Sequence, residues 1–125
     1  LKQVNDIHGH AAGTAFIQHV AEIIRGCLRH NDIVARFGGD EFIILLPQTG
    51  TIPTQVVAQR IREELQKTPL KFQDLQIFIT VSIGIASYPD HGRKYSEISG
   101  RADKALYESK ARGKDCVTVY SREFG

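Results

Sequence analysis

Apolar residues recur at helical spacing in three segments of the chain. In residues 14–30 the spacing matches one face of a helix, formed by Phe16, Ile17, Val20, Ala21, Ile24, Cys27 and Leu28. The pair Gly13–Thr14 predicts where this helix starts, because the threonine hydroxyl can accept a hydrogen bond from a free amide. Two further helices are predicted at about residues 53–67 and 96–112, and Gly113 is a natural stop for the last one.

Runs of β-prone residues lie between and after these helices. The runs "IVARF" (33–37) and "FIILL" (42–46) are separated only by "GGDE", and such a short, glycine-containing gap predicts a hairpin. Because "FIILL" is apolar throughout, we expect it to be a central strand. The run "LQIFITVSIGIAS" (75–87) is expected to pair with residues 70–72, and "CVTVY" (116–120) forms a final strand. This order predicts an α+β fold with a largely antiparallel central sheet flanked by helices.

Composition adds few constraints. The 125 residues suffice for one domain with a real core, and 42% hydrophobic and 24% charged residues are ordinary values for a globular protein. A net charge of only +2 gives no overall attraction to nucleic acid or membranes. No apolar run approaches membrane-spanning length, and Cys27 and Cys116 have no metal-type spacing, so we expect free thiols and a cytoplasmic location. The start at "LKQVND", without a methionine, suggests a fragment.

The predicted turn at "GGDE" has unusual chemistry. Gly38 and Gly39 lack a β-carbon, so the backbone can adopt positive φ and a ligand can approach closely. Asp40 and Glu41 repel each other unless they are solvated or held by a cation. Mg²⁺ takes one or two carboxylates and completes its shell with water and phosphate oxygens, so a metal–phosphate site is one interpretation. The other is an ordinary exposed turn, which composition alone favours because Gly and Asp are common turn residues.

Four segments resemble the motifs of one family, in the family's order and over nearly the whole chain. They are "LKQVNDIHGHAAGT" (1–14), "RFGGDEF" (36–42), "TVSIGIA" (80–86) and "RADKALYESKARGKD" (101–115). The sequence thus resembles the GGDEF family, the diguanylate cyclases. The resemblance implies a single domain over residues 1–125 with a palm-like fold, similar to adenylyl cyclases and polymerases, that lacks the family's first strand and preceding helix.

The resemblance also implies an activity, the condensation of two GTP molecules into cyclic di-GMP and pyrophosphate. It implies Mg²⁺ or Mn²⁺, a catalytic homodimer, and an N-terminal sensory or receiver domain in the parent protein. By motif position, Asp40 and Glu41 would be catalytic metal ligands. The substrate-binding residues would be Lys2, Asn5, Thr14, Gly38, Gly39, Lys110 and Lys114. Asn5 would bind the guanine edge, and the lysines would bind phosphates.

Several of these positions have plainer interpretations. Asn5 is also typical of a turn or cap, and Lys114 of a solvated helix end favoured by the helix dipole. The family usually has Arg where this chain has Lys114, and lysine keeps the charge but loses the bidentate fork. His10, in the "GH" pair, is expected to be structural, and no cluster around His8 suggests zinc.

A second site is implied by "RHND". Arg29 and Asp32 match the family's RxxD site, where the product cyclic di-GMP binds and inhibits. Arg60 matches an arginine that completes this site from a neighbouring domain. The plainer interpretations are an arginine at a helix C-terminus followed by a turn aspartate, and a solvated Arg60.

Two departures from the family weaken the case for catalysis. Thr14 replaces an aspartate that accepts hydrogen bonds from guanine, a loss of about 1–3 kcal/mol. We therefore expect weaker GTP affinity or blurred purine specificity. In addition, the family's first-strand metal-binding aspartate would precede Lys2, so the fragment itself is expected to be a poor catalyst.

Two functions stay open at this point. The intact "GGDEF" favours an active cyclase, whereas Thr14 favours a silent module that senses cyclic di-GMP or GTP. A palm acting on nucleic acid is disfavoured, because the sequence has no basic stripe with interleaved aromatic residues. Membrane attachment through other regions of the parent is left open.

Overall fold

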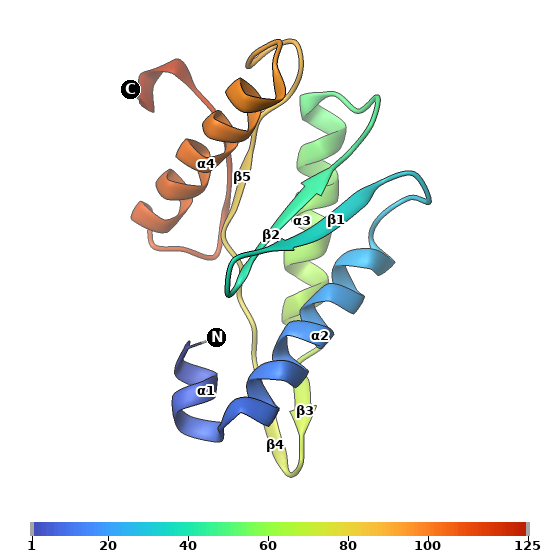
Figure 1. Ribbon diagram of the computed structural model, residues 1–125, viewed down its shortest axis with the longest axis vertical. Helices are drawn as coiled ribbons and strands as arrows, with labels where there is room; N and C mark the ends of the chain where they lie inside the picture. The colour runs from blue at the N-terminus through green and yellow to red at the C-terminus, as the bar shows by residue number, and fades with distance from the viewer. Residues whose placement is uncertain (1, 125) are drawn as a thin grey trace. The chain divides into compact units, whose positions relative to one another are not determined.

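The structure is a computed structural model that describes residues 2–124 (Figure 1), with side chains described from residue 4 onward. The chain divides into two compact units. The first unit contains residues up to 47 together with 64–79, and the second contains residues 48–63 together with those from 80 onward. Each unit is described by itself.

The first unit begins with two helices that the sequence analysis treated differently. Helix α1 (Lys2–His8) was not predicted, and α2 (His10–Gly26) begins four residues before the predicted start at Thr14. Gly9, with φ 89°, separates the two helices, and Figure 1 shows α1 turning sharply away from α2. The prediction that Thr14 caps a helix is therefore wrong, since Thr14 lies exposed inside α2.

The hairpin predicted around "GGDE" is confirmed. Strands β1 (Ile33–Phe37) and β2 (Glu41–Leu45) are antiparallel, and their register runs from Ile33 opposite Leu45 to Phe37 opposite Glu41. Among the described residues β2 pairs with β1 alone, and most of its residues are only half-buried. The expectation of a central strand is therefore not met, because apolar content does not by itself specify two partners.

The core of the first unit forms where α2 packs on a second hairpin. This hairpin consists of β3 (Leu70–Phe72) and β4 (Leu75–Ile77), which pair antiparallel as predicted. His19 of α2 lies with Nε2 2.6 Å from the Thr68 carbonyl oxygen, which accepts its hydrogen bond. The buried apolar residues of the unit are Ala12, Val20, Ile24, Leu65, Leu70 and Ile79.

The second unit is built around a β–α–β arrangement. Strands β5 (Ile83–Ile85) and β6 (Val117–Val119) are parallel and are joined through α4 (Tyr95–Ala111). A helical crossover is the usual connection between parallel neighbours. Helix α3 (Thr51–Lys67) contributes buried residues from its first part, and the short helix η1 (Arg122–Phe124) follows β6. The final strand and both helices were predicted, the helices with starts one or two residues late and the strand with a start one residue early.

Close packing of α4 on β5 depends on Gly84. A β-carbon at this position would overlap the Leu106 amide nitrogen and the Ala102 carbonyl oxygen. Further along α4, the buried Ser109 hydroxyl lies 2.9 Å from the Ile83 carbonyl oxygen and 2.7 Å from Thr118 Oγ1. Helices and short, mostly antiparallel strand pairs thus confirm the predicted α+β class.

Candidate functional site

The turn between β1 and β2 carries the two glycines and the first carboxylate. Gly38 has φ 77°, a left-handed conformation that side chains with a β-carbon disfavour. A β-carbon at Gly39 would meet no atom within 4 Å, so the turn is open on that side. Gly38, Gly39 and Asp40 are exposed. The backbone of this turn can therefore be approached closely by a ligand.

Glu41 differs from Asp40 in its backbone position. Both carboxylates were expected in the turn, but Glu41 is the first residue of β2 and is half-buried. One Glu41 carboxylate oxygen, Oε2, would lie 4.0 Å from a β-carbon built on Gly38, so this carboxylate folds back toward the turn. The two acids are thus held at the exposed end of a paired hairpin and are not enclosed in packing.

The donor set fits a hard cation. No group of three or more His, Cys, Asp or Glu side chains that could hold a metal ion occurs among the described residues. Mg²⁺ needs only one or two protein carboxylates when water and phosphate oxygens complete its shell. Asp40 and Glu41 could hold such an ion together with a bound triphosphate.

Asn5 lies against the backbone of α2. Its Oδ1 atom is buried and has no hydrogen-bond partner among the described residues. A β-carbon at Gly13 would overlap this oxygen, so the amide fits only because residue 13 is glycine. A buried polar atom without a partner is rare and calls for an explanation, and a bound ligand is one. Thr14, the next residue, is exposed on α2, while the side chain of Lys2 lies outside the described part.

Lys110 and Lys114 lie at the end of α4, in the second unit. Gly113, with φ 109°, ends the helix as predicted. The Gly113 amide donates to the Lys110 carbonyl oxygen, and the Lys114 amide donates to the Ser109 carbonyl oxygen. This pair of bonds is a Schellman motif, which fixes the backbone that carries both lysines. Both side chains are exposed.

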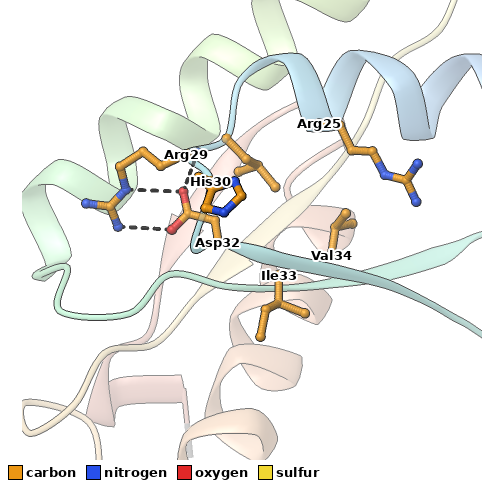
Figure 2. Close-up of a pocket in the computed structure, with 7 residues that line it drawn as sticks. Arg25, Arg29, His30, Asp32, Ile33 and Val34 are labelled. Atoms are coloured by element: carbon orange, nitrogen blue, oxygen red, sulfur yellow. Dashed lines mark hydrogen bonds and ion pairs between the residues drawn. The ribbon is translucent and has the colours of Figure 1, made fainter.

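Arg29 and Asp32 form a two-pronged ion pair (Figure 2). Arg29 Nη2 lies 3.0 Å from Asp32 Oδ1, and Arg29 Nε lies 3.2 Å from Asp32 Oδ2. The Arg29 backbone amide donates to the same carboxylate at 2.7 Å, and Nη2 also donates to the Pro47 carbonyl oxygen at 3.1 Å. The Asp32 side chain is 2% exposed, whereas that of Arg29 is 62% exposed. A ligand therefore meets the guanidinium first.

The pair shifts the ionisation of both groups. The side-chain hydrogen bond from Arg29 lowers the pKa of Asp32, and the same bond raises the pKa of Arg29. Both groups stay charged over the physiological pH range. The pair thus offers an exposed cation held by a buried carboxylate, which suits a ligand with an anionic part.

A shallow hollow of about 440 Å³ adjoins this pair. Its lining comprises Arg25, Leu28, Arg29, His30, Asp32, Ile33 and Val34. Figure 2 shows Arg25 and Arg29 extending in opposite directions from this lining. Arg60, predicted to complete such a site from a neighbouring domain, is exposed on α3 in the second unit.

A second hollow of about 440 Å³ lies beside the β1–β2 hairpin. Its lining comprises Ile17, Gln18, Ala21, Glu22, Arg25, Val34, Arg36 and Phe42. Arg25 lines both hollows and was given no role from the sequence. Arg36 was quoted in a motif but given no role.

Two curated relatives indicate the chemistry of this class of domain. "Diguanylate cyclase A" of Treponema denticola is 42% identical over 94% of this chain and 32% of its own length. "Cyclic di-GMP phosphodiesterase NbdA" of Pseudomonas aeruginosa is 35% identical over 98% of this chain and 16% of its own length. The chain thus spans less than a third of each relative.

No helix in the described part is both long and apolar enough to cross a membrane.

Solved structures agree with the fold. The GGDEF domain of PA1120 from Pseudomonas aeruginosa matches with a TM-score of 0.91 and 34% identity, over 96% of this chain and 75% of that one. The GGDEF domain of DgcB from Caulobacter crescentus, in complex with c-di-GMP, matches with a TM-score of 0.86 and 32% identity, over 94% and 70%. The family profile "Diguanylate cyclase, GGDEF domain" matches residues 1–116. With the hairpin, the fold and these matches in agreement, the chain belongs to the diguanylate cyclase GGDEF domain family.

Proposed function

We propose that the protein is a diguanylate cyclase that joins two GTP molecules into cyclic di-GMP. The observation that carries this proposal is the intact hairpin turn, with two glycines and two carboxylates presented at the exposed end of paired strands. Relatives named diguanylate cyclases, at 36–42% identity over most of the chain, support it.

The reaction needs positioning and charge neutralisation more than covalent help from the protein. The 3′-hydroxyl oxygen of each GTP forms a bond to the α-phosphorus of the other and loses its proton. The bond from that phosphorus to the bridging oxygen breaks, and pyrophosphate leaves with the electron pair. Two active sites must face each other, so the reaction requires a homodimer. Mg²⁺ or Mn²⁺, when bound at Asp40 and Glu41, supplies activation of the hydroxyl and neutralisation of phosphate charge.

The other residues hold the substrate. Asn5 has an amide that can both donate to and accept from the guanine edge, and its unpartnered Oδ1 gains a partner when a base binds. Gly38 and Gly39 let the nucleotide lie against the backbone. Lys110 and Lys114, and also Lys2, neutralise the β- and γ-phosphates.

Product inhibition would occur at the Arg29–Asp32 pair. A cyclic di-GMP molecule would place a phosphate or guanine O6/N7 on the exposed Arg29 guanidinium and donate guanine N–H groups to Asp32. Arg60 of a neighbouring domain would complete the contact. The solved DgcB domain, which holds c-di-GMP and is 32% identical, supports this ligand for the family.

The test uses the whole protein, because the chain covers only part of its relatives. We expect incubation with GTP and Mg²⁺ to yield cyclic di-GMP in a chromatographic assay, and Glu41→Ala to abolish it. We expect Arg29→Ala to relieve inhibition by added product. If the wild type forms no cyclic di-GMP with Mg²⁺ or Mn²⁺, the proposal is wrong.

We place the domain in the cytoplasm, where GTP is available, behind an N-terminal sensory or receiver domain.

A second candidate function is a silent module that binds cyclic di-GMP and regulates an attached domain. The specific observation in its favour is Thr14, exposed on α2, where the family motif has aspartate. The module would bind cyclic di-GMP tightly, form no product and lose binding in Arg29→Ala.

Thr14→Asp sharpens the choice between the two functions. We expect this variant to lower the KM for GTP about fivefold or more, because a carboxylate accepts two guanine N–H groups where a hydroxyl accepts one. An unchanged KM in steady-state kinetics would show that Thr14 does not limit GTP recognition.

A further inference from the structure

The side chain of Arg36 folds over the turn that carries the acids. Its Nε atom lies 3.2 Å from the Gly38 carbonyl oxygen and 3.1 Å from that of Gly39, and its Nη2 lies 2.6 Å from the Gly39 oxygen. The guanidinium thus donates to two consecutive carbonyls with two of its nitrogens. Arg36 itself lies in β1 opposite Phe42 of β2, so its backbone is fixed by strand pairing.

The turn is closed at its base by the pairing of Phe37 with Glu41. Gly38, Gly39 and Asp40 are exposed, and a β-carbon at Gly39 would meet no atom within 4 Å. Two adjacent glycines leave the backbone many accessible conformations, because neither has a β-carbon to restrict φ. A planar fork that binds both carbonyls selects one of these conformations.

We propose that Arg36 is a positioning residue for the candidate metal site. By holding the Gly38 and Gly39 carbonyls, it fixes the backbone from which Asp40 and Glu41 extend, so that both carboxylates are presented in one arrangement. This inference rests on the proposed function, because it assumes that Asp40 and Glu41 hold a metal ion.

The proposal differs from a purely structural role in what it predicts. A residue that only stabilises the hairpin would change the melting temperature and leave the metal dependence of the reaction unchanged. A positioning residue changes the Mg²⁺ requirement and kcat more than the KM for GTP, because the side chains proposed to bind guanine and phosphate lie elsewhere and only the Gly38–Gly39 backbone would be shared. Lysine at position 36 would keep the charge but lack the rigid planar fork that fits both carbonyls.

The experiment compares Arg36→Gln, Arg36→Lys and wild type in the whole protein, with Arg122→Gln as a matched control. Arg122 is exposed and lies in η1, outside the hairpin. We expect Arg36→Gln to lower kcat about tenfold or more and to raise the half-saturating Mg²⁺ concentration, since small displacements of reacting groups are costly. Arg36→Lys should have a kcat and a half-saturating Mg²⁺ concentration between those of wild type and Arg36→Gln. Arg122→Gln should match wild type in both. Hydrogen exchange of the Gly39 and Asp40 amides should be faster in Arg36→Gln.

The outcomes separate this inference from the function on which it rests. If the wild type is active and Arg36→Gln keeps its kcat and Mg²⁺ midpoint, Arg36 is no positioning residue. A lowered melting temperature with unchanged metal dependence has the same meaning. If the wild type forms no product, the proposed function fails, and equal amide exchange in wild type and Arg36→Gln then also excludes Arg36 as the group that orders the turn.

Discussion

The β1–β2 turn and the β5–α4 contact use glycine for opposite purposes. At Gly84 the missing side chain lets a helix pack directly on a strand, and an added β-carbon would overlap two backbone atoms. At Gly39 an added β-carbon would meet nothing within 4 Å. The first glycine serves packing within the protein, whereas the second leaves room for something outside it. Stability and chemistry are therefore expected to respond to different substitutions.

Glu41→Gln should give the largest effect and should change activity alone. The amide keeps the size of the side chain but removes the charge at the metal site, so we expect kcat to fall about a hundredfold or more. The melting temperature should stay within a degree or two, about the scale of a surface substitution. Steady-state kinetics and calorimetry on the same preparation test this. A strongly lowered melting temperature would contradict the idea that stability and chemistry respond to different substitutions.

Gly84→Ala should produce the opposite result. We expect a loss of about 3 kcal/mol in the free energy of unfolding, because overpacked sites cost 1–3 kcal/mol or more. Gly39→Ala is the matched control, since its methyl group has free space and its φ is not positive. Urea denaturation of both variants measures the difference. Equal stabilities would show that the β5–α4 contact adjusts at little cost.

Ser109→Ala should weaken the second region by a smaller amount. The buried serine hydroxyl contacts the Ile83 carbonyl and the Thr118 hydroxyl, and its removal leaves both without this partner. We expect a loss of about 1–2 kcal/mol in unfolding free energy, measured by urea denaturation. Activity at saturating GTP should be unchanged below the melting transition. A variant as stable as wild type would mean that a water molecule replaces the hydroxyl.

The Arg29–Asp32 pair should give the smallest effect, visible only against pH. The hydrogen bond from Arg29 lowers the pKa of Asp32 in the folded protein. The resulting stabilisation is therefore fully present above the unfolded-state pKa of about 3.9 and is lost as pH falls through the lower folded-state value. We expect the stability difference between wild type and Asp32→Asn to be constant from pH 5 to 7 and to shrink below about pH 4. A difference that persists at lower pH would contradict this assignment.

Part of the fold could be predicted because local patterns decide it. The three long helices and the hairpin follow from periodicity and from glycine-rich turns. The start of α2 could not be predicted in this way, because Gly13–Thr14 has the composition of a helix start while the actual break is at Gly9. Helix α1 is only seven residues long and has just two apolar residues, Val4 and Ile7, which is too short a pattern to predict it; it packs against α2.

The candidate site divides in the same way. The acids of the hairpin and the lysines at the end of α4 could be proposed from motifs, because each set lies within one short stretch of sequence. The role of Arg36 depends on where a long side chain folds back, and the burial of the Asn5 amide depends on a helix that was not expected. Such contacts are properties of three-dimensional packing, and spacing along the chain does not contain them.

Gly13 has a hydrogen atom where every other residue has a β-carbon, and this makes room for the Asn5 amide where α1 packs on α2. A β-carbon at position 13 would overlap the Asn5 amide oxygen, so a larger residue there would disturb both this side chain and the packing of α1 on α2. The packing of α1 on α2 needs this glycine whether or not the domain binds a nucleotide. Its retention in a domain therefore says little about whether that domain still turns over its substrate.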